Sequence, residues 1–140
     1  MTEKAYGFVV RDGDEGRELL VFEHAGMPEA GLQVPGGTVH TDTGETPLQA
    51  VAREVLEESG LPLGGWEGAA AFEANGQKWH CFVTTPALEL PDTWRCEPLG
   101  PERAQGLRFE YRWTPLEGGD ELAGAQEKAR RAVAGFVARG

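Results

Sequence analysis

The feature that most constrains this 140-residue sequence is an acidic segment at residues 53–61, preceded by a glycine-containing loop that begins at Pro35. Glu54, Glu57 and Glu58 have the i, i+3 and i+4 spacing that places side chains on one side of an α-helix. A separate arc of the same helix is apolar and contains Leu48, Val51, Ala52, Val55 and Leu56. We therefore expect a helix whose apolar arc packs on a core and whose carboxylates face a cleft.

Both ends of this helix are specified by local signals, which predict a helix over residues 46–59. Thr46 can serve as the N-cap, and Gln49 completes the spacing of a capping box. Gly60 is placed for a left-handed C-terminal cap, and Pro62 prevents the helix from continuing.

The acidic arc needs a counter-charge, because like charges one turn apart cost about 0.2–0.5 kcal/mol in an isolated helix. Arg53 lies beside the three carboxylates, but one guanidinium cannot neutralise all of them. A magnesium ion could, since Mg²⁺ takes one or two direct carboxylates and completes its shell with water and phosphate. The alternative is a charged helix face in contact with solvent, and the acidic triplet alone leaves both interpretations open.

The wider pattern consists of PGG at 35–37, Glu45, and REVLEESGL at 53–61. It resembles the signature of the Nudix hydrolase family: a glycine, a glutamate, then Arg-Glu-apolar-x-Glu-Glu-x-Gly-apolar. The resemblance covers residues 37–61, and elsewhere only the order of elements. One departure is the spacing, because seven residues separate Gly37 from Glu45 where the family usually has five. The extra length of this loop leaves the position of Glu45 relative to the helix open.

Outside the motif, the pattern predicts mixed α and β structure. Apolar runs and turn signals predict strands at residues 6–10, 18–22, 66–74, 77–85 and 107–113. Residues 88–105, with three prolines, are expected to form a loop over the sheet, and 120–139 a second helix. The family resemblance implies more: an α/β/α sandwich, with a mixed β-sheet between the motif helix and the C-terminal helix, as a single domain over residues 1–140.

The charge of the chain limits its partners. Thirteen basic and 23 acidic residues give a net charge of −10, which argues against binding of a nucleic-acid polymer through basic patches. No apolar segment approaches the length of a membrane span and no signal peptide is visible, so we expect a cytoplasmic protein without membrane contact. Cys81 and Cys96 lack metal-ligand spacing, and reduced thiols are expected.

The resemblance also implies an activity: hydrolysis of a nucleoside diphosphate linked to another moiety, with Mg²⁺, or Mn²⁺ in its place, as cofactor. The metal ligands that it implies are the carbonyl of Gly37 and the carboxylates of Glu54, Glu57 and Glu58. Glu54 or Glu57 would also serve as the base that accepts a proton from water. Arg53 and Glu45 would orient the acids of the helix.

The sequence leaves several roles open. Family members often recruit a further acid, for which the candidates are Glu97, Glu102 and Glu110. Trp94, in the proline-rich loop, is a candidate to stack on a base. The competing hypothesis is a non-catalytic Nudix-like module that binds a nucleotide or another ligand for regulation. The sequence identifies neither the substrate nor the oligomeric state. Dimers are common among members of the family.

Overall fold

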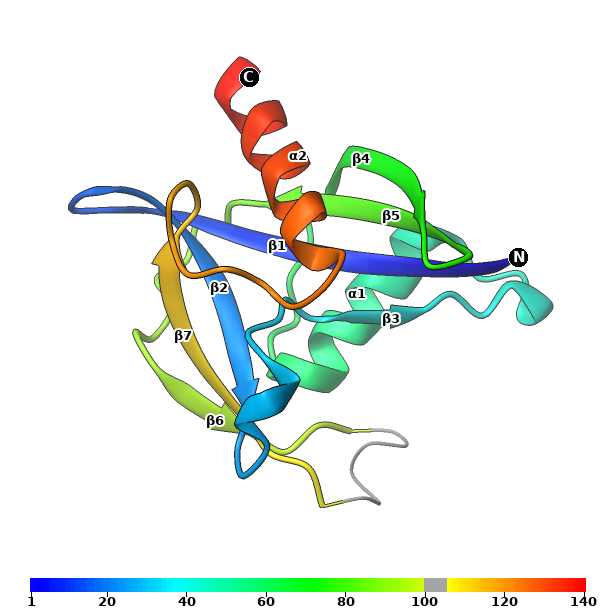
Figure 1. The fold of residues 1–140 in the computed structure, drawn as a ribbon, viewed down its shortest axis with the longest axis horizontal. Helices are drawn as coiled ribbons and strands as arrows, with labels where there is room; N and C mark the ends of the chain where they lie inside the picture. Colours follow the sequence, from blue (N-terminus) through cyan, green and yellow to red (C-terminus); the bar gives the residue numbers. More distant parts are fainter. Residues whose placement is uncertain (100–105) are drawn as a thin grey trace.

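The computed structural model describes residues 1–99 and 106–140. Its elements are β1 Thr2–Gly13, β2 Gly16–His24, β3 Gly36–Thr38, α1 Pro47–Ser59, β4 Glu67–Ala74, β5 Gln77–Thr84, β6 Trp94–Cys96, β7 Phe109–Pro115 and α2 Gln126–Arg139, with 3-10 turns at Pro28–Ala30 and Thr41–Thr43. The strands form one mixed sheet in the order β4-β5-β1-β2-β7-β6, and β3 adds to β1 (Figure 1). Within the described ranges, no helix has the length and apolar character needed to cross a bilayer.

The long first strand organises the sheet. Along residues 2–9, β1 pairs in parallel with β5. On its other edge it pairs antiparallel with β3 at residues 4–6 and with β2 at residues 10–13. Because β3 and β2 follow one another along the same edge, the sheet opens between them. The chain crosses this opening just before β3, where the amide of Gly7 donates to the carbonyl of Pro35 at 2.8 Å.

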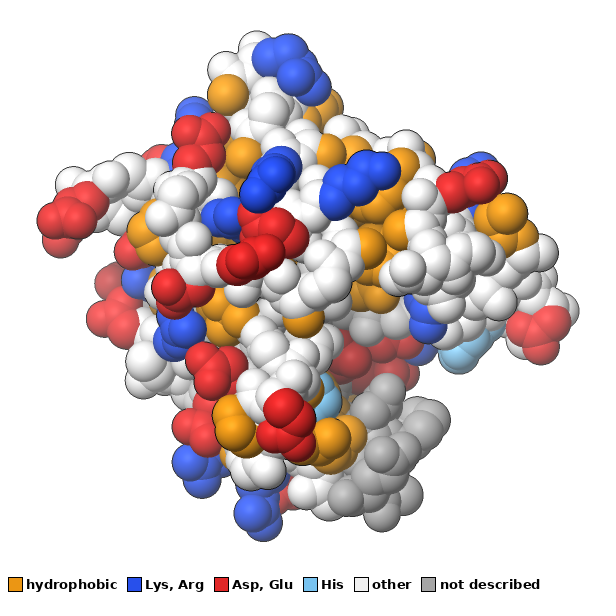
Figure 2. Space-filling model, in the orientation of Figure 1, with side chains coloured by type: hydrophobic (Ala, Val, Ile, Leu, Met, Phe, Trp, Pro, Cys, Tyr) orange, Lys and Arg blue, Asp and Glu red, His pale blue; other side chains and the backbone are white. Residues whose placement is uncertain are grey.

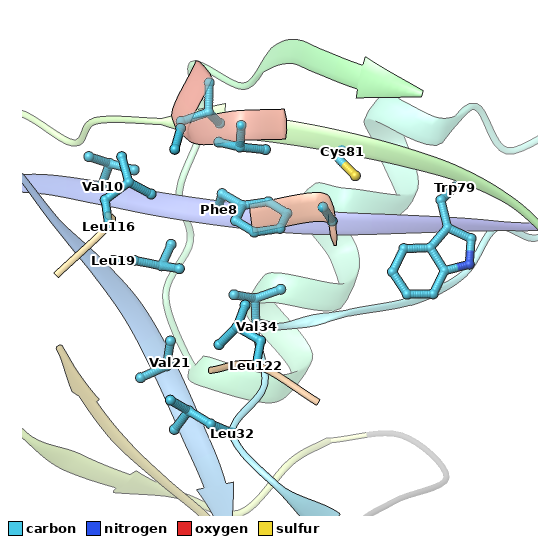
Figure 3. Packing of buried hydrophobic residues seen from close by; sticks show 14 residues of the cluster. Phe8, Val10, Leu19, Val21, Leu32, Val34, Trp79, Cys81, Leu116 and Leu122 are labelled. Carbon is cyan, nitrogen blue, oxygen red and sulfur yellow. The ribbon is translucent and has the colours of Figure 1, made fainter. Parts of the chain in front are cut away.

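The two helices cover opposite faces of the sheet, α2 in front of β4 and β5 and α1 behind β1 and β3 (Figure 1). Alternation along β1 sends neighbouring side chains to the two cores. Phe8 packs in the cluster that includes Val133 of α2 (Figure 3), and Val9 packs in the cluster that includes Val55 of α1. The expected α/β/α arrangement, with a mixed sheet between the motif helix and the C-terminal helix, is therefore confirmed.

The motif helix α1 has both of its predicted ends. The Thr46 hydroxyl accepts from the amide of Gln49 at 3.2 Å, and the Gln49 side chain accepts from the amide of Thr46 at 3.0 Å. Together these bonds form the capping box. Gly60 ends the helix in the left-handed conformation, with φ of 80°, and its amide donates to Leu56.

Replacing Thr46 with alanine is expected to lower the free energy of unfolding by about 1 kcal/mol, because it removes the hydroxyl that accepts from the amide of Gln49. Urea denaturation of Thr46→Ala against the wild type measures the difference. Thr85→Ala, at an exposed threonine outside the helices and strands, is the matched control. Equal losses in the two variants would contradict a capping role for Thr46.

One prediction about α1 is wrong. The sequence pattern places Leu48 and Leu56 on the core-facing arc, but they are 50% and 42% exposed. The helix is rotated so that Ala50, rather than Leu48, reaches the core. The reason is that the acidic side of α1 is itself covered by the glycine turn at the opening of the sheet. Glu54 and Glu58 are therefore buried, and the two leucines turn to solvent.

Two further differences lie outside the motif. The expected loop at 88–105 contains strand β6, which pairs antiparallel with β7. The C-terminal helix begins at Gln126, not at residue 120, because Gly124 has φ of +52°, which a right-handed helix cannot accommodate. Leu122 is buried before the helix starts and bridges to Leu32. The hairpin turn predicted at Asn75–Gly76 is confirmed, with both residues at positive φ.

Candidate active site

The acidic side of α1 faces a cavity of about 440 Å³ at the opening between β2 and β3. Its described lining comprises Lys4, Tyr6, Phe22, His24, Gln33, Val34, Gly36, Gly37, Thr38, His40, Arg53, Glu54, Glu57, Glu58, Phe109 and Gln126. Figure 2 shows acidic side chains set back in a recess of this face. The cleft expected from the spacing of the three glutamates is therefore present, and the glycine turn forms part of its wall.

The glycine turn approaches the helix closely. The amide of Gly36 donates to Oε1 of Glu58 at 2.9 Å. A Cβ atom added to Gly37 would lie 2.6 Å from the carboxyl carbon of Glu54, closer than real Cβ contacts come. A side chain at position 37 would therefore displace this carboxylate from its place against the turn. Glycine is required at position 36, where a Cβ would lie 2.5 Å from the backbone carbonyl oxygen of Ala5, and neither glycine of the turn has a positive φ.

Arg53 connects the acids of the site. Its Nε and Nη2 atoms form a bidentate pair with Glu45, at 2.7 Å and 3.0 Å. Nη1 lies 2.9 Å from Oε1 of Glu54 and 3.4 Å from Oε2 of Glu57. Nη2 also donates to the carbonyl of Thr38 at 3.0 Å. One guanidinium thus fixes two acids of the helix and one acid of the preceding loop relative to the β3 strand.

The longer loop does not displace Glu45. The loop contains the 3-10 turn Thr41–Thr43, which ends at Gly44 in the left-handed conformation. The amide of His40 donates to Oε1 of Glu45 at 2.9 Å and holds the carboxylate facing Arg53. The hydrogen bonds from Arg53 are the largest cause of a low pKa for Glu45, at about 2, so this carboxylate is ionised throughout the physiological range.

The donor set fits a magnesium ion that keeps part of its water shell. Among the described residues, no three His, Cys, Asp or Glu side chains converge into a ready-made metal cage. Mg²⁺ does not need one, because it is held by one or two carboxylates together with water and substrate phosphates. The glutamates and the backbone at Gly37 supply hard oxygen donors around one cavity. Glu57 has a side chain that is 25% exposed and lies on the cavity wall.

Comparison with known protein families agrees with this geometry. The family described as NUDIX domain matches residues 1–136. The chain belongs to the Nudix family. No curated protein matches it.

Solved structures of Nudix proteins share the fold of this chain at low identity. The NUDIX domain of Shewanella oneidensis NrtR, described in complex with ADP ribose, has a TM-score of 0.70 at 14% identity and matches 96% of this chain and 87% of its own. A MutT protein, from a study of the Aliivibrio salmonicida and Vibrio cholerae proteins, has a TM-score of 0.65 at 17% identity. The match covers 96% of this chain and 98% of the MutT chain. The C. elegans Ap4A hydrolase has a TM-score of 0.61 at 19% identity, and the match covers 100% of both chains.

The sequence left open a further acid and a base-stacking tryptophan outside the Nudix motif, and those that the structure describes lie outside the cavity lining. Glu97 lies 3.4 Å from Arg108, and Glu110 lies 3.6 Å from Arg95, both as exposed pairs outside the cavity lining. Glu102 is outside the described residues. Trp94 stacks on Tyr111, and its Nε1 donates to the carbonyl of Ser59 at 3.1 Å. Its ring is thus part of the packing around the end of α1.

Several cavity residues of this Nudix domain were not identified from the sequence, because they come from strands and a helix far from the motif. Lys4 donates from Nζ to the Thr38 hydroxyl at 2.8 Å. Burial, with the charge of Glu58 second, raises the pKa of Tyr6 to about 12, so its hydroxyl stays protonated. Gln126, the first residue of α2, accepts from the amide of Val34 at 2.8 Å. None of them carries a local signal of a site.

The ion pair between Glu45 and Arg53 predicts that the free energy of unfolding falls at acid pH. Because the pKa of Glu45 is lowered to about 2, its ionised form stabilises the folded state at pH values above the ordinary glutamate pKa. This contribution is lost progressively as the pH falls from about 4.5 to about 2. Glu45→Gln should flatten the dependence of unfolding free energy on pH in that window, as measured by urea denaturation. Glu29→Gln, at an exposed glutamate, should not.

Proposed function

We propose that this protein is a Mg²⁺-dependent hydrolase that cleaves the diphosphate linkage of a nucleoside diphosphate derivative by attack of water, with Mn²⁺ as the substitute ion. The single observation that supports this most strongly is the group of glutamates held by Arg53 against the glycine turn, at the wall of a cavity. Oxygen donors and a fixed guanidinium suit the binding and orientation of a charged diphosphate.

The residues can be given distinct tasks in this proposal. Gly37, Glu54, Glu57 and Glu58 would hold the cation. When bound, Mg²⁺ offsets the charge of the diphosphate and acidifies a coordinated water. Glu57 is the better candidate for the base, because its side chain is 25% exposed against 10% for Glu54 and its contact with Arg53 is longer. Arg53 and Glu45 position the helix carboxylates.

A second candidate function is a Nudix module that binds a nucleotide derivative without cleaving it. The observation that favours it is the fold shared with NrtR, whose NUDIX domain is described with ADP ribose. NrtR is also described in complex with a 27mer DNA, but this chain covers only 62% of that longer protein. DNA binding is therefore not part of our proposal for this chain.

A hydrolysis panel separates the two candidates. The protein is incubated with Mg²⁺ and ADP ribose, dinucleoside polyphosphates, nucleoside diphosphate sugars and nucleoside triphosphates, and the products are resolved by anion-exchange chromatography. We expect release of a nucleoside monophosphate and a phosphorylated remainder from at least one class, abolished by EDTA and restored by Mg²⁺. Tight binding of a nucleotide derivative without turnover across the panel would overturn the hydrolase and favour the binding module.

A further inference from the structure

The last turn of α1 carries two of the motif acids at an unfavourable end of the helix. Glu57 and Glu58 lie next to its final residue, Ser59, and no basic residue accompanies them in this turn. A helix C-terminus has a partial negative charge, so carboxylates at this end are destabilising. The last four carbonyl groups of a helix also have no partners within the helix itself. Hydrogen-bond donors from elsewhere in the chain would satisfy both needs.

Donors from β7 and from the segment after β6 meet these carbonyls. The hydroxyl of Tyr111 donates to the carbonyl of Glu58 at 2.9 Å, and this bond is buried. The amide of Leu99 donates to the carbonyl of Glu57 at 2.8 Å. Both acids of the last turn are therefore held through their own backbone by residues that are distant in the sequence.

Trp94 completes the set of donors and supports Tyr111. Its Nε1 donates to the carbonyl of Ser59 at 3.1 Å, so three successive carbonyls of α1 have donors from this side of the sheet. Trp94 of β6 lies opposite Tyr111 of β7, and their rings stack with centroids 5.0 Å apart. Tyr111 is buried, so packing fixes the position of its hydroxyl.

We infer that Tyr111, supported by Trp94, is a positioning residue of the active site, which fixes the last turn of α1 so that the carboxylates of Glu57 and Glu58 are held at the cavity. Neither aromatic residue belongs to the described cavity lining, so both act through the helix backbone. This inference rests on the proposed function, because it assigns the positioned acids to Mg²⁺. Arg53 contacts the carboxylate of Glu57, whereas Tyr111 fixes the backbone of the same turn, so the two constraints are independent.

The variant Tyr111→Phe removes the hydroxyl and keeps the ring that stacks on Trp94. At saturating Mg²⁺, kcat for the best substrate of the panel should fall about tenfold, because small displacements of reacting groups are costly. KM should stay within about twofold of the wild type, since the variant leaves the described cavity lining unchanged. Calorimetric titration with Mg²⁺ alone should show an affinity about threefold or more weaker, because two of the proposed ligands lose their fixed arrangement.

Thr114→Val is the matched control for the hydroxyl. It removes a buried hydroxyl from the same strand, but the bond of Thr114 goes to the amide of Asp120, in the loop before α2, at 3.1 Å. Both variants should lower the midpoint of urea unfolding, and only Tyr111→Phe should change kcat and Mg²⁺ affinity. If Tyr111→Phe lost stability but kept both values, the hydroxyl would be merely structural and the inference would be overturned. Equal losses of kcat in the two variants would also overturn it.

The variant Trp94→Phe tests the same clamp from its second aromatic residue. It keeps a ring for stacking but removes Nε1, and it should weaken Mg²⁺ affinity in the same direction as Tyr111→Phe, by a smaller factor, because Ser59 carries no carboxylate. Trp113→Phe is its control, since Nε1 of Trp113 donates to the carbonyl of Pro91 at 3.0 Å. An equal loss of affinity in Trp113→Phe would contradict a specific role for the end of α1.

The Mg²⁺ affinities do not depend on turnover. If the hydrolysis panel is negative, but the wild type binds Mg²⁺ and Tyr111→Phe weakens this binding, the proposed hydrolase fails and the positioning role stands. If hydrolysis is observed and Tyr111→Phe matches Thr114→Val in kcat and Mg²⁺ affinity, the hydrolase stands and the positioning role fails. A wild type with neither turnover nor Mg²⁺ affinity would overturn both.

Discussion

Glu57→Gln is expected to reduce Mg²⁺-dependent turnover by about 10²-fold or more, because the amide can neither accept a proton from water nor supply a charged metal ligand. The fold should survive, since the contact of the Glu57 side chain with Arg53 is long, at 3.4 Å, and the substitution conserves shape. Turnover of the best substrate from the panel gives the rate, and circular dichroism with urea denaturation reports the fold.

The matched control for Glu57→Gln is Glu73→Gln, which removes the same charge from an exposed position on β4, outside the cavity lining. It should leave turnover unchanged. If purified, folded Glu57→Gln protein had the wild-type rate, the proposed role of Glu57 in Mg²⁺-dependent hydrolysis would be contradicted. Calorimetric titration with Mg²⁺ adds a readout that does not require turnover, and a weaker affinity is expected only for Glu57→Gln.

Arg53→Lys is expected to lower turnover by about 100-fold and the free energy of unfolding by about 2 kcal/mol. Lysine conserves the charge, but its single ammonium group cannot reproduce the fork that holds Glu45 with two bonds while contacting Glu54 and Glu57. The helix acids would lose their fixed arrangement, and small misplacements of catalytic groups are costly. Steady-state kinetics and urea denaturation measure the two effects.

Arg95→Lys is the control for this change, because Arg95 forms an exposed pair with Glu110 at 3.6 Å. Its stability should stay within about 0.5 kcal/mol of the wild type, as for most surface substitutions. If Arg53→Lys retained full turnover, geometry at the helix acids would matter less than charge, and the positioning role of Arg53 would have to be abandoned.

The parts of this protein that could be predicted from sequence are those whose signals are local. The caps of α1 at Thr46 and Gly60 depend on bonds within a few residues, and the Asn75–Gly76 turn depends on two φ angles. The expected cleft at the helix acids was also found. The spacing of Glu54 and Glu57 placed them on one side because the helix period is fixed.

What could not be predicted depends on contacts between distant segments. The exposure of Leu48 reflects the orientation of α1 on the sheet, in which Glu58 is turned toward the distant glycine turn and accepts from the amide of Gly36. Strand β6 has three residues and is defined by its pairing with β7, not by its own pattern. His24 lines the cavity at the end of β2, and nothing in residues 20–26 indicates a cavity position.

The bonds between His40 and Glu45 have a consequence for loop length. The carbonyl of His40 accepts from the amide of Glu45 at 3.1 Å, while the amide of His40 donates to the Glu45 carboxylate. The two hydrogen bonds close the loop at its base, between His40 and Glu45. Residues 41–44 are exposed and lie beyond this closure. Such a closed appendage is where a peptide tag or a fluorescent label can be grafted, and where related chains can gain or lose residues, without disturbing the chemistry beside it.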